Sequence, residues 1–169
     1  MCEKSGPDET SGSEETSGTF VVTHADAESA VVRDVETARV HTLSSNPGVA
    51  ADDVLEATLS ADAPLGLTWR VVDVDDRRTV ELVDSDLEPT RRSLDAASNA
   101  EPGELTTFER AGCGEVHVLA VPVEELDAAA ADVLEDPETI ARAARLGATR
   151  VEVRRARDGG VLSVRYLPA

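Results

Sequence analysis

The stretch from residue 136 to residue 168 constrains the fold of this chain most. Asp136 is a good helix N-cap, and Pro137 suits the first helical position because that position needs no N–H donor. Gly147 can turn left-handed and so end the helix. Apolar and polar residues then alternate on both sides of Asp158-Gly159, a two-residue hairpin signal. The pattern predicts a helix followed by a β-hairpin with a type I′ turn.

The same pattern predicts the register of this hairpin. A two-residue loop at Asp158-Gly159 sets four pairs opposite one another: Val153 with Val164, Val151 with Tyr166, Glu152 with Arg165, and Arg154 with Ser163. One face of the hairpin is then apolar on both strands. The Glu152–Arg165 pair on the other face is attractive and stabilises the hairpin by roughly 0.2–1 kcal/mol. A shift of one residue would set apolar side chains against polar ones, because the side-chain period of a strand is two.

Residues 112–169 read as one small domain. Residues 115–121 are apolar on both faces, which is typical of a strand inside a sheet, and Pro122 ends them. Residues 123–134 carry apolar side chains at helical spacing. With the helix and hairpin described above, the order is β-α-α-β-β. We expect an α+β domain with its helices on one face of the sheet.

The first half of the chain predicts a small antiparallel β-barrel. Residues 1–17 are mostly Ser, Gly, Glu and Thr, and we expect a disordered acidic tail because they carry too little apolar surface to fold. Short β-rich segments follow at 19–23, 30–32, 38–43, 53–59, 67–74 and 79–83, the last of them expected to pair back onto 67–74. Closure of residues 18–84 into a barrel would remove their exposed edges. Residues 85–111 read as an acidic linker with a short helix after Pro89.

Two resemblances accompany this reading. The strand order, the break at Pro47-Gly48 and the run Asp52–Ala57 resemble an OB-type or TRAM-like barrel over residues 18–83, although Asp52-Asp53 stands where such barrels commonly have Gly-Asp. Over its whole length the chain resembles an uncharacterised protein family of haloarchaea. That likeness is carried by the start at 18–24, the strand at 115–119 and the ending at 161–168. The first resemblance implies an OB-like fold. The second gives no indication of an activity, because that family is uncharacterised.

The charge of the chain is strongly negative. It has 34 acidic and 16 basic residues, a net charge of −18, and Lys4 is its only lysine. Carboxylates hold water and keep a surface soluble in concentrated salt, so this composition indicates a halophilic archaeal protein. No apolar run reaches the ~20 residues that span a membrane, and the polar N-terminus does not read as a secretion signal, so we expect a cytoplasmic protein.

This reading of the charge predicts a strong dependence of stability on salt. Self-repulsion among the carboxylates should destabilise the fold where screening is weak, and the Debye length grows from about 3 Å at 1 M salt to about 10 Å at 0.1 M. Thermal unfolding across a KCl series should therefore show the melting temperature rising steeply with salt. A melting temperature independent of KCl would contradict the halophilic interpretation.

No catalytic constellation emerges from residue spacing. His24, His41 and His117 lie in no tight metal-binding motif, although His24 and His41 both fall in the predicted barrel and could meet across strands. Cys113 lies between two glycines with no histidine in the same turn, and Cys2 lies far from it, so neither a disulfide nor a zinc site is indicated. Nucleotide-binding and hydrolase motifs are missing from the sequence. We therefore predict no catalytic residues, metal or cofactor. An enzyme that uses Cys113 or the pair His24 and His41 is the alternative.

The arginines are distributed unevenly. From residue 141 onward there are seven arginines and only two acids. The candidate patch consists of Arg142, Arg145, Arg150, Arg154, Arg155 and Arg165. We expect it either to dock the two domains or a protein partner, which would make the protein a binding or adaptor module, or to bind nucleic acid such as RNA. The second reading would need stacking on Phe20 and Trp69, because counterion release fails in concentrated salt. It is disfavoured because residues 18–90 carry five basic residues against fifteen acidic ones.

Overall fold

The computed structural model describes residues 14–63, 65–110 and 114–168. They form an α+β protein with two sheets and three α-helices among the described residues. The chain divides into two units. The first comprises residues up to Val80 together with 140–145, and the second comprises residues 81–139 and 146–169. Each unit has its own sheet. Among the described helices, none has both the length and the apolar character needed to cross a membrane.

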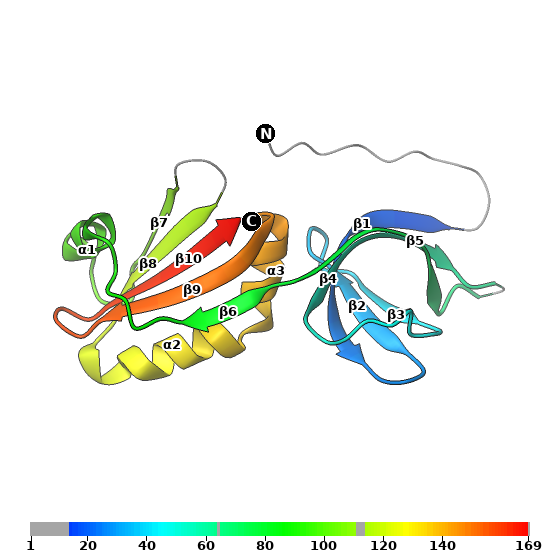
Figure 1. Ribbon diagram of the computed structural model, residues 1–169, viewed down its shortest axis with the longest axis horizontal. Coiled ribbons are helices and arrows are strands. Elements are labelled where there is room, and N and C mark those ends of the chain that lie inside the picture. The colour runs from blue at the N-terminus through cyan, green and yellow to red at the C-terminus, as the bar shows by residue number, and fades with distance from the viewer. Residues whose placement is uncertain (1–13, 64, 111–113, 169) are drawn as a thin grey trace. The chain divides into compact units, whose positions relative to one another are not determined.

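The first unit contains a closed barrel of five strands (Figure 1). They are β1 (Glu15–Ala25), β2 (Ala30–Asp34), β3 (Val40–Leu43), β4 (Asp53–Ala61) and β5 (Trp69–Thr79). The order around the barrel is β1-β2-β3-β5-β4. All neighbours are antiparallel except β3 and β5, which meet in parallel at Leu43 and Trp69. The predicted closure of this half of the chain into a barrel agrees with this arrangement. Strand β1 begins at Glu15, four residues before the strand predicted at 19–23 and inside the stretch 1–17 that was predicted to be a disordered tail.

The barrel interior is filled by aliphatic side chains and one phenylalanine. Its cluster consists of Phe20, Val22, Ala30, Val32, Leu43, Val49, Leu55, Ala57 and Leu59. Alternation along the strand explains which residues of β4 belong to the cluster. Leu55, Ala57 and Leu59 are every second residue of β4 and so point to the same side of it. Full burial of a leucine or phenylalanine stabilises the fold by about 1.5–3 kcal/mol, so this cluster is the main source of stability of the first unit.

The second unit is built on a five-stranded sheet. Its strands are β6 (Glu81–Asp84), β7 (Leu105–Glu109), β8 (Glu115–Ala120), β9 (Ala148–Ala156) and β10 (Val161–Pro168), in the order β6-β9-β10-β8-β7. Its helices are α1 (Arg91–Ser98), α2 (Leu126–Glu135), which follows a short 3₁₀ turn at Val123–Glu125, and the first residues of α3 (Pro137–Arg145). Strand β6 runs parallel to β9, and the other neighbours are antiparallel.

The register of the β9–β10 hairpin is confirmed, whereas its predicted turn type is wrong. All four expected pairs are present, including Val153 with Val164 and Glu152 with Arg165. A type I′ turn requires positive φ at Asp158 and Gly159. In the structure the positive φ values fall at Gly159 (90°) and Gly160 (62°) instead. The register therefore follows from side-chain pairing on the two strands rather than from the expected turn.

The expected linker and the expected pairing of residues 79–83 are both wrong. Residues 81–84 form β6, which pairs with β9 rather than with β5. Within the predicted linker, α1 and β7 belong to the second unit, where β7 pairs with β8. Leu94 and Ala97 of α1 and Phe108 of β7 join the apolar cluster formed with Val116, Val118, Ala156 and Val161. A segment with so few apolar residues folds here because the sheet supplies most of the apolar surface that it covers.

Helices cover both faces of this sheet, not one as predicted. Val118 lies opposite Ser163, which lies opposite Arg154, so these three side chains share the face that α1 covers. Arg155 points to the other face, where it bonds Asp127 of α2. Helix α2 runs along β6, β9 and β10 on that side (Figure 1). The β-α-α-β-β core is therefore present, extended by β6, α1 and β7.

Candidate functional site

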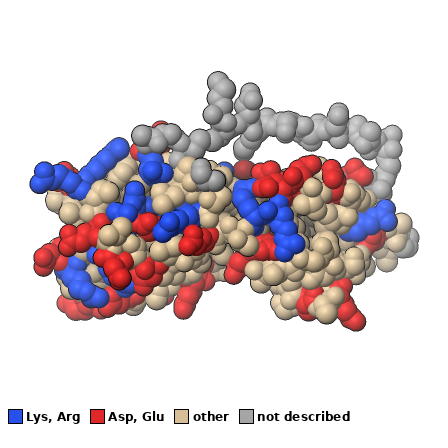
Figure 2. All heavy atoms as spheres, viewed as in Figure 1, with Lys and Arg blue, Asp and Glu red and all other residues tan. Residues whose placement is uncertain are grey.

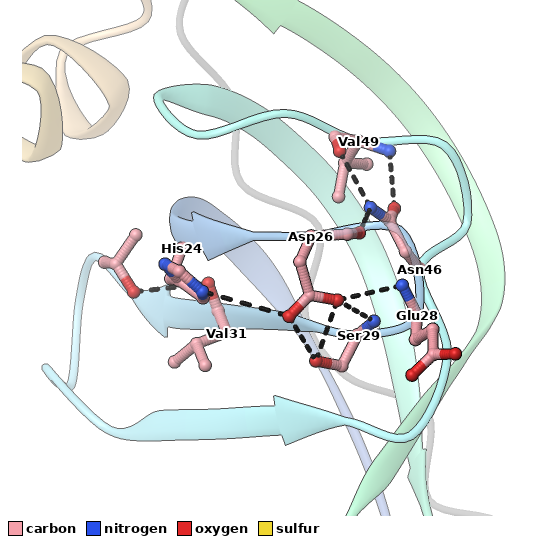
Figure 3. A network of polar contacts seen from close by, with 8 residues as sticks. His24, Asp26, Glu28, Ser29, Val31, Asn46 and Val49 are labelled. Carbon is pink, nitrogen blue, oxygen red and sulfur yellow. Dashed lines mark hydrogen bonds and ion pairs between the residues drawn. The ribbon is translucent and has the colours of Figure 1, made fainter.

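The loop between β1 and β2 is held by one carboxylate (Figure 3). Asp26 Oδ1 accepts hydrogen bonds from the backbone N–H groups of Glu28 and Ser29, each at 2.8 Å. These bonds, Glu28 first, lower the pKa of Asp26 below its ordinary value. The side chain of Asn46 donates to the carbonyl oxygen of Asp26 at 2.6 Å and to that of Val49 at 3.2 Å. The β1–β2 loop is thereby tied to the β3–β4 loop.

The loop between β4 and β5 is held in a similar way. Thr68 Oγ1 donates to Asp62 Oδ2 at 2.8 Å, and the two residues are also joined through their backbones. Hydrogen bonds from the hydroxyls of Ser44 and Thr68 lower the pKa of Asp62. Ser44 follows β3 directly and also bonds the carbonyl oxygen of Trp69. The loop is therefore anchored to the end of β3.

These loops converge at the end of β3 and form what we call the barrel rim: residues 26–29, 44–46, 62–63 and 65–68. The rim exposes two leucines from the β4–β5 loop, since Leu65 is 76% exposed and Leu67 is 77% exposed. The outer side of β3 adds exposed Val40 and Thr42. The β4–β5 loop therefore exposes apolar side chains on a backbone that is fixed by hydrogen bonds.

The two residues predicted to stack on bases lie in different environments. Phe20 has no exposed surface and is part of the barrel interior, so its ring cannot stack on a ligand in this structure. Trp69 is half-buried and packs against the same interior. His41 lies between them, with ring centroids 5.8 Å from Phe20 and 4.6 Å from Trp69. The stacking prediction fails for Phe20 because alternation along β1 turns it inward.

The three histidines do not come together. His41 is buried in the barrel, and burial lowers its pKa, so it is neutral near pH 7. His24 is exposed on β1 beside Asp26, at 4.0 Å. His117 is in the second unit, where it contacts Glu115 at 3.0 Å and the ring of Tyr166. No group of three or more metal-ligating side chains that could hold an ion occurs among the described residues. Cys113 lies outside the described residues.

Three of the predicted patch arginines surround one buried carboxylate. Glu152 has a side chain that is 7% exposed, and its Oε1 accepts a hydrogen bond from Arg154 Nε and another from Arg165 Nη1 at 3.5 Å. Its Oε2 lies 3.8 Å from Arg150 Nη2. Arg154 also donates to the carbonyl oxygen of Glu88 at 3.3 Å. We call Arg150, Arg154, Arg165 and Glu152 the arginine cluster.

The other three arginines lie elsewhere. Arg155 bonds Asp84 and, at 2.8 Å, Asp127, on the opposite face of the sheet from the cluster. Arg145 Nη1 donates to the carbonyl oxygen of Val35 at 3.0 Å within the first unit. Arg142 is half-buried on α3. The six arginines of the predicted patch thus lie in three separate environments and do not form one surface. Figure 2 accordingly shows basic and acidic side chains interspersed over the face in view.

Sequence reasoning found the arginines but missed what surrounds them. The pairing of Glu152 with Arg165 was visible in the hairpin register, whereas Asp84 and Asp127 are brought to Arg155 by β6 and α2, which are distant in sequence. Leu67 falls in the strand predicted at 67–74, whereas in the structure it precedes β5 and shares the β4–β5 loop with Leu65. The sequence contains a pattern that indicates an exposed apolar loop, because two leucines flank Gly66 in a segment bounded by turn residues.

Comparison with known proteins finds a match to a protein-family model. A family model described as "Family of unknown function (DUF5812)" matches residues 16–155. No curated protein and no solved structure matches the chain. The family match covers most of both units, from the first described strand to the last residues of β9. The chain therefore belongs to the DUF5812 family, a family of unknown function.

Proposed function

We propose that this protein is a non-enzymatic binding module of a halophilic cytoplasm, and that its barrel rim binds a segment of a protein partner. The strand order β1-β2-β3-β5-β4, with β3 and β5 parallel, supports an OB-type assignment of the barrel. In that architecture the face of the second and third strands and the loops 1–2 and 4–5 bind ligands. The barrel rim occupies the corresponding position in this chain.

The observation that carries the proposal is the exposure of Leu65 and Leu67 on an anchored loop. Large apolar side chains more than three-quarters exposed are costly to leave in water and are useful where a partner covers them. Asp62 and Ser44 hold the loop before any partner arrives. Such preorganisation lowers the ordering cost of binding.

The charge around the rim indicates the chemistry of the partner. Asp26, Glu28 and Asp62 line the two loops, and the low pKa values of both aspartates keep them ionised. A polyanion would be repelled here, which disfavours nucleic acid at the rim. A protein segment with apolar residues to cover the leucines and basic residues to meet the carboxylates fits this surface. The separation of the three histidines supports a binding role over a catalytic one.

A pull-down with the full-length protein as bait, from a lysate of the native host in multimolar KCl, tests the proposal. Leu65→Ser/Leu67→Ser should lose the captured protein, because the two apolar anchors are gone, while the wild type keeps it. Leu87→Ser is the matched control, since Leu87 is also exposed (59%) but lies in the second unit. It should capture as much as the wild type.

Treating half of each sample with nuclease separates the two classes of partner. Capture that survives nuclease and disappears only in the double variant supports the proposal. Capture that nuclease abolishes would favour the nucleic-acid alternative. Equal capture by the wild type and the double variant would show that the rim is not the binding surface.

A further inference from the structure

The arginine cluster carries more positive charge than its one carboxylate compensates. Three guanidinium groups meet the single side chain of Glu152, which leaves the cluster with a net charge of +2. The side chains of Arg154 and Arg165 are only 14% and 16% exposed, so water screens this excess less than it would on an open surface. Excess positive charge in a partly buried site favours binding of an anion.

Of the two largely buried arginines of the cluster, Arg165 has the less complete set of partners. A guanidinium carries five N–H donors, and the hydrogen bond of Arg165 to Glu152 is a long one at 3.5 Å. Each side-chain nitrogen of Arg165 either has a hydrogen-bond partner or is exposed to solvent. The N–H donors that do not bond Glu152 can therefore bond an incoming group. Burial, and next the neighbouring charges of Arg154 and Arg110, lower the pKa of Arg165 in spite of Glu152. An anion at this guanidinium would relieve that repulsion.

One further polar side chain lies beside the cluster on the same face of the sheet. Ser163 lies directly opposite Arg154, and its buried Oγ has no hydrogen-bond partner among the described residues. Arg150 lies at the margin, with a side chain that is 45% exposed. The cluster thus has a buried side at Glu152 and an accessible side toward Arg150.

We propose that Arg150, Arg154 and Arg165 bind one phosphate-type oxyanion, carried by a small phosphorylated molecule, on the accessible side of the arginine cluster. A phosphate monoester carries a charge of about −1.5 to −2 at pH 7, which matches the uncompensated charge of the cluster. Its oxygens suit guanidinium forks, which bind phosphate through paired N–H groups. The arginine cluster lies in the second unit and the barrel rim in the first, so phosphate binding can be tested separately from the proposed partner binding.

The charge of the rest of the second unit favours a small ligand over a polymer. That unit carries 18 acidic residues against 8 arginines. A nucleic acid would bring many phosphates against this surface, and only one would find compensating charge. A small molecule with a single phosphate group contacts the arginine cluster without placing further phosphates against the acidic surface.

Calorimetric titration of the full-length protein with inorganic phosphate tests the site, with KCl adjusted to keep the ionic strength constant. Binding should be saturable, whereas chloride at the same ionic strength should give no saturable signal. Arg165→Gln should weaken phosphate binding about ten-fold or more, because it removes charge-assisted hydrogen bonds. Arg150→Gln should weaken binding several-fold. Because the side chain of Arg150 is 45% exposed, this variant should fold and provides the test if Arg165→Gln does not fold.

Arg157→Gln is the matched control. Arg157 also lies on the hairpin, but it pairs with Asp127 at 3.0 Å and is not part of the cluster. Its affinity for phosphate should equal that of the wild type. The proposal is overturned if phosphate binds no better than chloride, or if Arg165→Gln and Arg150→Gln both bind phosphate as the wild type does. Saturable binding of a single-stranded oligonucleotide, lost in Arg165→Gln and without binding of inorganic phosphate, would overturn it in favour of nucleic acid.

Discussion

Replacing Gly160 by alanine is expected to destabilise the second unit by about 4 kcal/mol or more, a size of effect that marks a specific steric failure. Gly160 has φ of 62°, and an added Cβ would lie 1.9 Å from the carbonyl oxygen of Val121. The carbonyl oxygen of Gly160 also accepts a hydrogen bond from the N–H of Val121 at 2.8 Å. Because the atoms that clash are backbone atoms held by that hydrogen bond, the hairpin must move away from the end of β8. Urea unfolding followed by far-ultraviolet circular dichroism measures the loss.

Gly159 provides the matched control for this prediction. It has φ of 90°, but an added Cβ would meet nothing within 4 Å. Gly159→Ala should therefore show only the cost of a left-handed alanine, about 1–2 kcal/mol. Equal destabilisation by the two substitutions would show that the contact with Val121 does not constrain the turn.

Replacing Glu152 by alanine is expected to cost about 3–5 kcal/mol, the range found when one partner of a buried ion pair is removed. The side chain of Glu152 is 7% exposed and is shared by three arginines. Its removal leaves Arg154 and Arg165 close to each other, partly buried and without a compensating carboxylate. The effect should appear as a lower midpoint of urea unfolding in concentrated KCl, where repulsion between exposed charges is already screened.

Asp127→Ala is the control for burial. Asp127 also serves two arginines, Arg155 at 2.8 Å and Arg157 at 3.0 Å, and its pKa is lowered first by its hydrogen bond with Arg157. Its side chain is 60% exposed, however, so water replaces the lost interactions and stability should change little. If Asp127→Ala and Glu152→Ala had the same effect, burial of Glu152 would not be the source of the predicted loss.

The local structure of the C-terminal stretch could be predicted from sequence because its determinants are neighbours in the chain. Helix α3 begins at Pro137 as expected, and Asp136 Oδ1 accepts a hydrogen bond from the N–H of Glu138 at 2.9 Å. The register of β9 and β10 follows from a side-chain period of two and from facing apolar residues. Even here the turn differed, because Gly160 can take the positive φ that had been assigned to Asp158.

Only the tertiary structure decided how distant segments pair and which predicted site residues are accessible. Strand β6 has four residues and pairs in parallel with β9, more than sixty positions later, and its sequence pattern does not specify that edge. Burial of Phe20 depends in the same way on closure of the barrel. The sequence by itself determined the α+β class, the C-terminal hairpin register and the excess of negative charge, because these depend on local periodicity and composition. The tertiary structure decided the membership of β6, α1 and β7 in the second unit, the leucine-bearing rim and the approach of Asp84 and Asp127 to Arg155, because each requires contacts between residues far apart in the chain.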